Sequence, residues 1–136
     1  MPPPLPPTFT TRPVISGTFG VVSSTHWVAS QVGMSVLEKG GNAFDAAVAA
    51  GLTLQVVEPH MNGLGGDAVA AFQAKGKKAQ ILCGQGPAPA GATIAHYKNE
   101  GLDLVPGTGF LAAVIPGAFD TWMLMLRDYG TMTLAE

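Results

Sequence analysis

The sequence feature that most constrains the fold is a helix-start signal at residues 40–45. It opens with two glycines, which can adopt the positive φ that ends a preceding helix. Asn42 is a favourable N-cap, and Asp45 stands three residues later, where its carboxylate can accept from the amide of Asn42. Apolar residues follow on nearly every side, and Pro59 cannot continue a helix. The signal therefore predicts a capped, buried helix at about residues 43–57.

The rest of the chain shows weaker helix and strand patterns. Apolar residues recur at helical spacing in some segments, and short runs of strand character lie between turn-forming residues in others. These patterns predict helices at about 27–39, 94–99 and 118–129, and strands at 18–24, 68–72, 79–83 and 111–115. Ser24 or Thr25 is the expected cap of the first helix, and residues 75–78 are expected to turn a hairpin. This order predicts an α+β fold with two helices lying on a mostly antiparallel sheet.

Two predictions concern the core. The last helix should bury one stripe of large apolar side chains, namely Phe119, Trp122, Met123, Leu126 and Tyr129. Cys83, at the end of a predicted strand, is expected to be a small buried hydrophobe and not a reactive thiol, and a lone cysteine cannot form an intrachain disulfide.

Composition bears on partners and on surroundings. Only 12% of the residues are charged, where a free-standing domain has about 25%. We therefore expect much of the surface to be covered by other polypeptide, and the chain to be a fragment. Residues 1–13 are proline-rich, lack the features of a signal peptide and are expected to form a flexible leader before a domain at 14–136. A cytoplasmic location is expected, without a nucleic-acid or membrane partner.

The usual catalytic constellations are absent from the sequence. His26, His60 and His96 are far apart and have no accompanying carboxylate or thiol at ligand spacing. No serine lies in a nucleophile elbow, and no phosphate-binding glycine motif opens a helix. Neither a metal nor a cofactor is expected.

A glycine-rich turn precedes the first hairpin strand. Gly63, Gly65 and Gly66 are expected to let the backbone pass close to a ligand or to a neighbouring strand, and the sequence leaves both readings open. Asp67 follows at once, either to hold the loop or to line a site.

Several separated motifs together resemble one family. They are Gly-Gly-Asn-Ala-Phe-Asp-Ala-Ala-Val-Ala-Ala from Gly40, Val-Glu-Pro-His from Val57, Gly-Leu-Gly-Gly from Gly63, Gly-Gln-Gly-Pro-Ala-Pro from Gly84 and Pro-Gly-Ala from Pro116. In this order they are similar to the N-terminal part of the large subunit of γ-glutamyltransferases, and the resemblance covers about residues 9–136. The Gln-Gly-Pro-Ala-Pro version looks more like the branch that contains cephalosporin acylases.

The resemblance implies a fold and a mechanism. The fold would be the αββα sandwich of N-terminal-nucleophile hydrolases, incomplete in this chain. A precursor would cleave itself, and a threonine at the new N-terminus of a small subunit would attack the acyl carbonyl, with its own α-amine as base. That threonine would lie beyond Glu136, so no catalytic residue is assigned here. The partners implied are the small subunit and the remainder of the large subunit.

One substrate-binding position should lie in this chain. The family usually places an arginine followed by a glutamate at the positions that align with Gln85 and Gly86, and the arginine holds the substrate's α-carboxylate. A neutral amide cannot replace a guanidinium, so the resemblance predicts weakened use of glutathione. Gln85 could still hydrogen-bond an acyl substrate, or serve only the structure of the loop.

The sequence thus predicts part of an amidohydrolase or acyltransferase that acts on γ-glutamyl or related acyl amides. A catalytically inactive homologue and a module that binds a small anion or a protein are the alternatives.

Overall fold

The computed structural model describes residues 14–136, so the predicted leader at 1–13 lies outside the described part. The elements are α1 (Trp27–Glu38), α2 (Ala43–Val57), β1 (Ala68–Phe72), β2 (Gln80–Gly84), α3 (Ile94–Asn99), the 3-10 helix η1 (Phe110–Ala112) and α4 (Ala118–Tyr129). The helices and the hairpin strands thus match the predicted ranges within one residue. In the described part, no helix is both long and apolar enough to cross a membrane.

The hairpin is the sheet of the described region. β1 and β2 pair antiparallel, with Ala68 opposite Gly84 and Phe72 opposite Gln80. The predicted turn is confirmed, because Gly76 has a φ of 72° and the amide of Lys77 donates to the carbonyl of Ala74. The antiparallel pairing agrees with the predicted α+β class.

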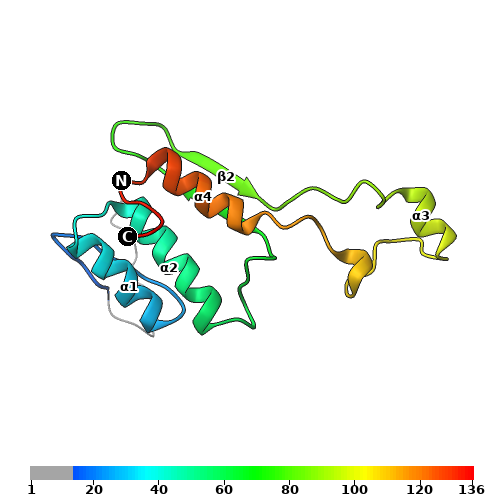
Figure 1. Ribbon diagram of the computed structural model, residues 1–136, viewed down its shortest axis with the longest axis horizontal. Coiled ribbons are helices and arrows are strands. Elements are labelled where there is room, and N and C mark those ends of the chain that lie inside the picture. Colours follow the sequence, from blue (N-terminus) through cyan, green and yellow to red (C-terminus); the bar gives the residue numbers. More distant parts are fainter. Residues whose placement is uncertain (1–13) are drawn as a thin grey trace, which may run out of the picture.

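The elements stack in an order that the sequence does not predict. α4 packs against both strands, α2 packs against α4, and α1 packs against α2 (Figure 1). The prediction that the first two helices lie on the sheet is therefore wrong, since α4 covers the strands. α2 reaches the hairpin at one end, where the rings of Phe44 and Phe72 lie 5.4 Å apart and both contact Tyr129.

Small residues allow α1 and α2 to approach closely. Ala29 and Gly33 of α1 are buried, and a Cβ on Gly33 would lie 3.2 Å from the carbonyl oxygen of Ala46 in α2. α2 is buried on more than one side, because α1 and α4 both pack against it and its buried residues are Asp45, Ala46, Val48, Ala50 and Gly51. This agrees with the predicted buried helix, although Val56 in its last turn is 77% exposed.

The sequence predicts the N-cap of α2 correctly but not the N-cap of α1. The capping box of α2 is present as expected: Asn42 accepts from the amides of Phe44 and Asp45, and Asp45 accepts from the amide of Asn42. The cap of α1 is His26, whose Nδ1 accepts from the amide of Val28, and not Ser24 or Thr25. The two predicted caps donate elsewhere, Ser24 to the carbonyl of His26 and Thr25 to the carboxylate of Glu58.

The core stripe of α4 is shifted from its prediction. The buried residues are Ala118, Thr121 and Met125, whereas Phe119 is 45% exposed. Trp122 is half-buried, with its ring against Gly51 of α2, where a Cβ would lie 2.6 Å from the indole. The fully buried side chains are thus different from the predicted ones, of which Trp122, Met123, Leu126 and Tyr129 are only partly buried.

Two predicted strands are absent from the described structure. Residues 18–24 have no regular structure, because they pair with neither strand of the hairpin. At 111–115, Gly109 has a φ of 85°, and the amides of Ala112 and Ala113 bond to Gly109 and Phe110, which gives η1. Strand propensity alone does not form a strand without a neighbouring chain.

Residues 88–114 form an arm that leaves the body between β2 and α4 (Figure 1). The arm carries α3 and η1, which are joined where the hydroxyl of Tyr97 donates to the carbonyl of Leu111. Among the described elements, α3 packs against no other helix or strand. Several large apolar side chains of the arm face solvent, with Phe110 fully exposed and Leu104 82% exposed.

Candidate functional site

The predicted substrate position, Gln85, opens onto a cleft of about 500 Å³. One wall is the end of β2 and the residues that follow it, and the other is the first two turns of α4 with the three residues before them. The lining residues are Leu82, Cys83, Gly84, Gln85, Gly86, Pro87, Ile115, Pro116, Gly117, Asp120, Thr121 and Leu124. The two walls join at the base of the arm, where the amide of Ile115 donates to the carbonyl of Pro87.

Three glycines let these walls meet. A Cβ on Gly84 would overlap the hydroxyl of Thr121, one on Gly86 would overlap the carbonyl oxygen of Ile115, and one on Gly117 would overlap the carbonyl of Gly84. Gly86 also has a φ of 78°, in the region that favours glycine. The chain therefore fixes the backbone around Gln85 through direct contact of main-chain atoms.

The polar groups of the cleft come from both walls. The side-chain oxygen of Gln85 lies 3.4 Å from the thiol of Cys83, and Thr121 donates to the carbonyl of Gly117 at 2.8 Å. Asp120 is exposed in the first turn of α4, and within the described residues its carboxylate has no hydrogen-bond partner. The cleft can therefore offer an amide and a free carboxylate to a ligand.

Cys83 is exposed, so the prediction of a buried residue is wrong. β2 is one strand of a two-stranded sheet, and α4 covers only one of its faces, which leaves alternate side chains on the other face uncovered.

We expect Cys83 to react with a small thiol reagent in the folded chain of these 136 residues. Labelling should reach one equivalent per chain of these 136 residues without denaturant, because the thiol is exposed. Mass spectrometry of the labelled peptide measures the result, and Cys83→Ser is the control. Labelling that needs denaturant would show that this strand is covered.

The glycine-rich turn lies on the other side of the hairpin's open end. The amide of Gly66 donates to the carbonyl of Gly63, and the carbonyl of Gly66 accepts from the amides of Gly117 and Ala118, both at 3.1 Å. This carbonyl therefore caps the start of α4. The turn approaches a helix N-terminus, and not a neighbouring strand.

Asp67 and the turn border a separate cleft of about 630 Å³. Its lining includes all three predicted glycines, Gly63, Gly65 and Gly66, together with His60 and Trp122. In strand register, Asp67 falls opposite Gln85, one position beyond the last pair of the hairpin. The structure thus brings Asp67 and Gln85 to the same end of the sheet, but they line different clefts.

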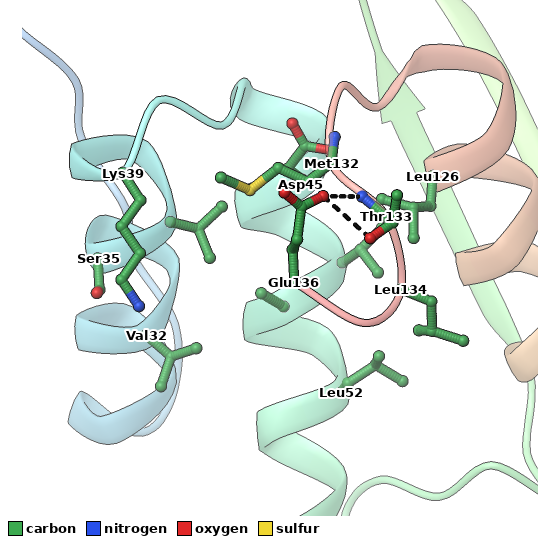
Figure 2. Close-up of a pocket in the computed structure, with 13 residues that line it drawn as sticks. Val32, Ser35, Lys39, Asp45, Leu52, Leu126, Met132, Thr133, Leu134 and Glu136 are labelled. Atoms are coloured by element: carbon green, nitrogen blue, oxygen red, sulfur yellow. Dashed lines mark hydrogen bonds between the residues drawn. The ribbon is translucent and has the colours of Figure 1, made fainter.

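A third cleft, of about 300 Å³, lies among α1, α2 and the last residues of the chain (Figure 2). Asp45 closes one end of it and is only 3% exposed. Its carboxylate accepts from the amide of Asn42 at 2.7 Å, the amide and hydroxyl of Thr131 at 2.9 and 2.7 Å, and the amide of Met132 at 3.2 Å.

Burial by itself raises the pKa of Asp45, but the hydrogen bonds from Thr131, Asn42 and Met132 outweigh it and hold the pKa below the ordinary 3.8. The carboxylate is therefore ionised at neutral pH, with its acceptor positions occupied by the protein's own donors. It joins segments of the fold and has little capacity left for a ligand.

In residues 14–136, no three histidine, cysteine, aspartate or glutamate side chains gather in a way that could hold a metal ion. His26 has the capping role already described, and His60 and His96 line different clefts.

Asp120 and Thr121 are the site residues that sequence reasoning missed. They lie 35 and 36 positions after Gln85, on the far side of the arm, so no local spacing links them to it. The available signal was Pro116-Gly117, which marks a helix start and places Asp120 in the first turn.

Comparisons of the sequence and of the structure with known proteins identify the same family. The profile of the γ-glutamyltranspeptidase family matches residues 29–136. The chain is 42% identical over 124 residues to the glutathione hydrolase-like YwrD proenzyme of Bacillus subtilis, covering 90% of this chain and 23% of that protein. It spans about a quarter of the length of this relative and of an acylase ACY 1 proenzyme from a Pseudomonas species.

Two solved structures extend the comparison. One, described as LmbA2991HD, is 66% identical with a TM-score of 0.86, covering 93% of this chain and 22% of that one. The other is the cephalosporin acylase of Bacillus halodurans, 36% identical with a TM-score of 0.86, covering 98% and 25%. The profile match, the proenzyme relatives and the shared fold lead to one conclusion: the chain belongs to the γ-glutamyltranspeptidase family.

Proposed function

We propose that these residues are part of an enzyme that cleaves γ-glutamyl or related acyl amides through an acyl-threonine intermediate. The threonine would be supplied from outside these 136 residues. The observation that carries the proposal is the family match over residues 29–136, together with relatives that are named glutathione hydrolase and acylase proenzymes. No metal or cofactor enters the proposed reaction.

The proposed architecture follows from the same similarity. The hairpin and its covering helix α4 would form one part of an αββα sandwich, completed by polypeptide beyond the described residues. The exposed apolar residues of the arm and the low share of charged residues agree with such coverage. A cytoplasmic location stays a prediction, which cell fractionation would test.

The proposed role of this region is to shape one wall of the acyl-binding site. Gln85 lies directly after β2, and close contacts at Gly84, Gly86 and Gly117 fix its backbone. The position of its Cα atom is therefore well defined. Defined placement is what a group that orients a substrate needs. The resemblance gives this position to a substrate-binding residue, and the cleft gives it room for a ligand.

The test begins with intact mass analysis of the protein expressed from the complete gene. Two polypeptides are expected, the smaller beginning with threonine, and the processed protein should release p-nitroaniline from acyl anilides. Replacement of that threonine by alanine should leave one uncleaved chain without activity. A single chain in the wild type, inactive on every anilide, would overturn the proposal and favour an inactive homologue.

A further inference from the structure

Gly84, the last residue of β2, lies directly against Thr121 of α4. A Cβ on Gly84 would overlap the hydroxyl oxygen of Thr121 and would lie 2.9 Å from the Cβ of Thr121. The side chain of Thr121 is only 2% exposed, so it fills the space between the strand and the helix. Close packing of this kind transmits a change in one side chain to its neighbours. Thr121 therefore sets how closely α4 approaches the end of β2.

Hydrogen bonds hold the side chain of Thr121 in one orientation. Its hydroxyl donates to the carbonyl of Gly117 at 2.8 Å, and its amide donates to the same carbonyl at 3.0 Å. A threonine in a helix chooses between two rotamers, and a bond from the hydroxyl to a carbonyl one turn earlier stabilises one of them. The amide of Gly117 donates in turn to the carbonyl of Gly66 at 3.1 Å. The side chain that contacts Gly84 is thus anchored to the start of α4 and to the glycine-rich turn.

The place of Gln85 depends on this contact. Gln85 directly follows Gly84, and consecutive Cα atoms stay about 3.8 Å apart. A shift of Gly84 relative to α4 would therefore move the Cα atom of Gln85 as well. A group that orients a substrate has to be held within about 0.5 Å of its productive place. Thr121, being almost completely buried, has little surface of its own for a substrate and acts on the cleft through the neighbouring chain.

We infer that Thr121 is a positioning residue of the proposed acyl-binding site. Its buried side chain sets the place of Gln85, and through Gln85 the preference among acyl groups. This inference rests on the proposed function, because it needs Gln85 to contact the acyl group.

A double-mutant cycle between Thr121 and Gln85 tests the inference in the processed enzyme. The readout is the selectivity ratio, which is kcat/KM for glutaryl p-nitroanilide, with a polar acyl end, divided by kcat/KM for butyryl p-nitroanilide, with none. Gln85→Ala should lower this ratio about tenfold, the value of one hydrogen bond to a charged group. Thr121→Val replaces the hydroxyl by a larger methyl group that cannot bond to Gly117, and should lower the ratio to a similar extent. In the double variant, the ratio should equal that of Gln85→Ala alone.

Three further variants separate positioning from a general loss of stability. Thr121→Ser keeps the hydroxyl and should keep most of the selectivity ratio. Thr121→Ala removes the same contact without adding bulk, should lower the ratio, and replaces the valine variant if that does not fold. Met125→Val is the matched control, because Met125 is buried one turn further along α4 and does not line the cleft. It should lower the melting temperature and leave the ratio unchanged.

Binding of both anilides to the same proteins, measured by calorimetry, distinguishes this inference from the proposed function. If neither anilide is cleaved but the dissociation constants show the same coupling, the proposed reaction fails and the inference stands. If both are cleaved and the effects of Thr121→Val and Gln85→Ala simply add, the inference fails and the reaction stands. A ratio that either single variant leaves unchanged, or binding of neither anilide, would also overturn the inference.

Discussion

Replacement of Asp45 by alanine is expected to destabilise the protein by roughly 3–4 kcal/mol. The carboxylate is buried and accepts hydrogen bonds from Asn42, Thr131 and Met132. Alanine would leave these donors without an acceptor in a region that water reaches poorly, and a buried donor without a partner is costly. It would also remove the capping box that begins α2.

Equilibrium unfolding in denaturant measures this effect. Asp45→Asn keeps the size of the side chain but places an amide donor against backbone donors, so it should also destabilise the protein, by less than alanine. Asp103→Ala is the matched control, because Asp103 is exposed in the arm. A loss equal to that of the control would contradict the structural role given to Asp45.

The same carboxylate gives stability a pH dependence with a definite sign. The pKa of Asp45 is lower in the folded protein than its ordinary 3.8. The unfolded chain therefore binds the proton more readily, and stability falls as pH drops from about 3.8 through the lower folded pKa. Above that range the contribution is complete. In Asp45→Asn, stability should depend less on pH over this range than in the wild type. Thermal melting at a series of pH values measures the difference.

Replacement of Gly86 by alanine is expected to destabilise the protein by roughly 3–4 kcal/mol. Two costs combine there: an L-residue at a φ of 78° is strained, and the new methyl group would overlap the carbonyl oxygen of Ile115. The carbonyl belongs to backbone that is held by the bond from Ile115 to Pro87, so it cannot simply rotate away. The wall of the Gln85 cleft would have to shift.

A matched glycine separates the two costs. Gly101 has nearly the same φ, 75°, but nothing lies within 4 Å of the position of its Cβ. Gly101→Ala should therefore cost only the strain, roughly 1–2 kcal/mol. Thermal melting of both variants gives the comparison. Equal losses would show that the backbone at Ile115 yields easily and that the cleft is not rigid.

Local signals in the sequence were sufficient for most helices and for the hairpin. The capping box at Asn42 and Asp45 predicted the start of α2 at the correct residue, because its partners lie within one turn. Gly76 between two strand-like runs predicted the hairpin in the same way. Each of these signals involves residues close in the chain, which is why one sequence reveals them.

Features that depend on distant partners were not predictable. Residues 18–24 have strand-like composition but no strand beside them, and Cys83 is exposed because its side of the hairpin has no cover. The cleft joins Gln85 to Asp120, which lie on opposite sides of the arm. The resemblance indicated Gln85, whereas only the three-dimensional arrangement indicates the carboxylate across from it.

The bonds from Thr131 to Asp45 connect residues 86 positions apart and so close a large loop that contains the hairpin and the arm. The entropy lost in closing a flexible loop grows only with the logarithm of its length, by about 0.6 kcal/mol for each doubling. The arm lies within this loop, yet its two ends already meet where Ile115 bonds to Pro87. Relatives can therefore lengthen or shorten the arm at small thermodynamic cost while keeping the body that presents Gln85.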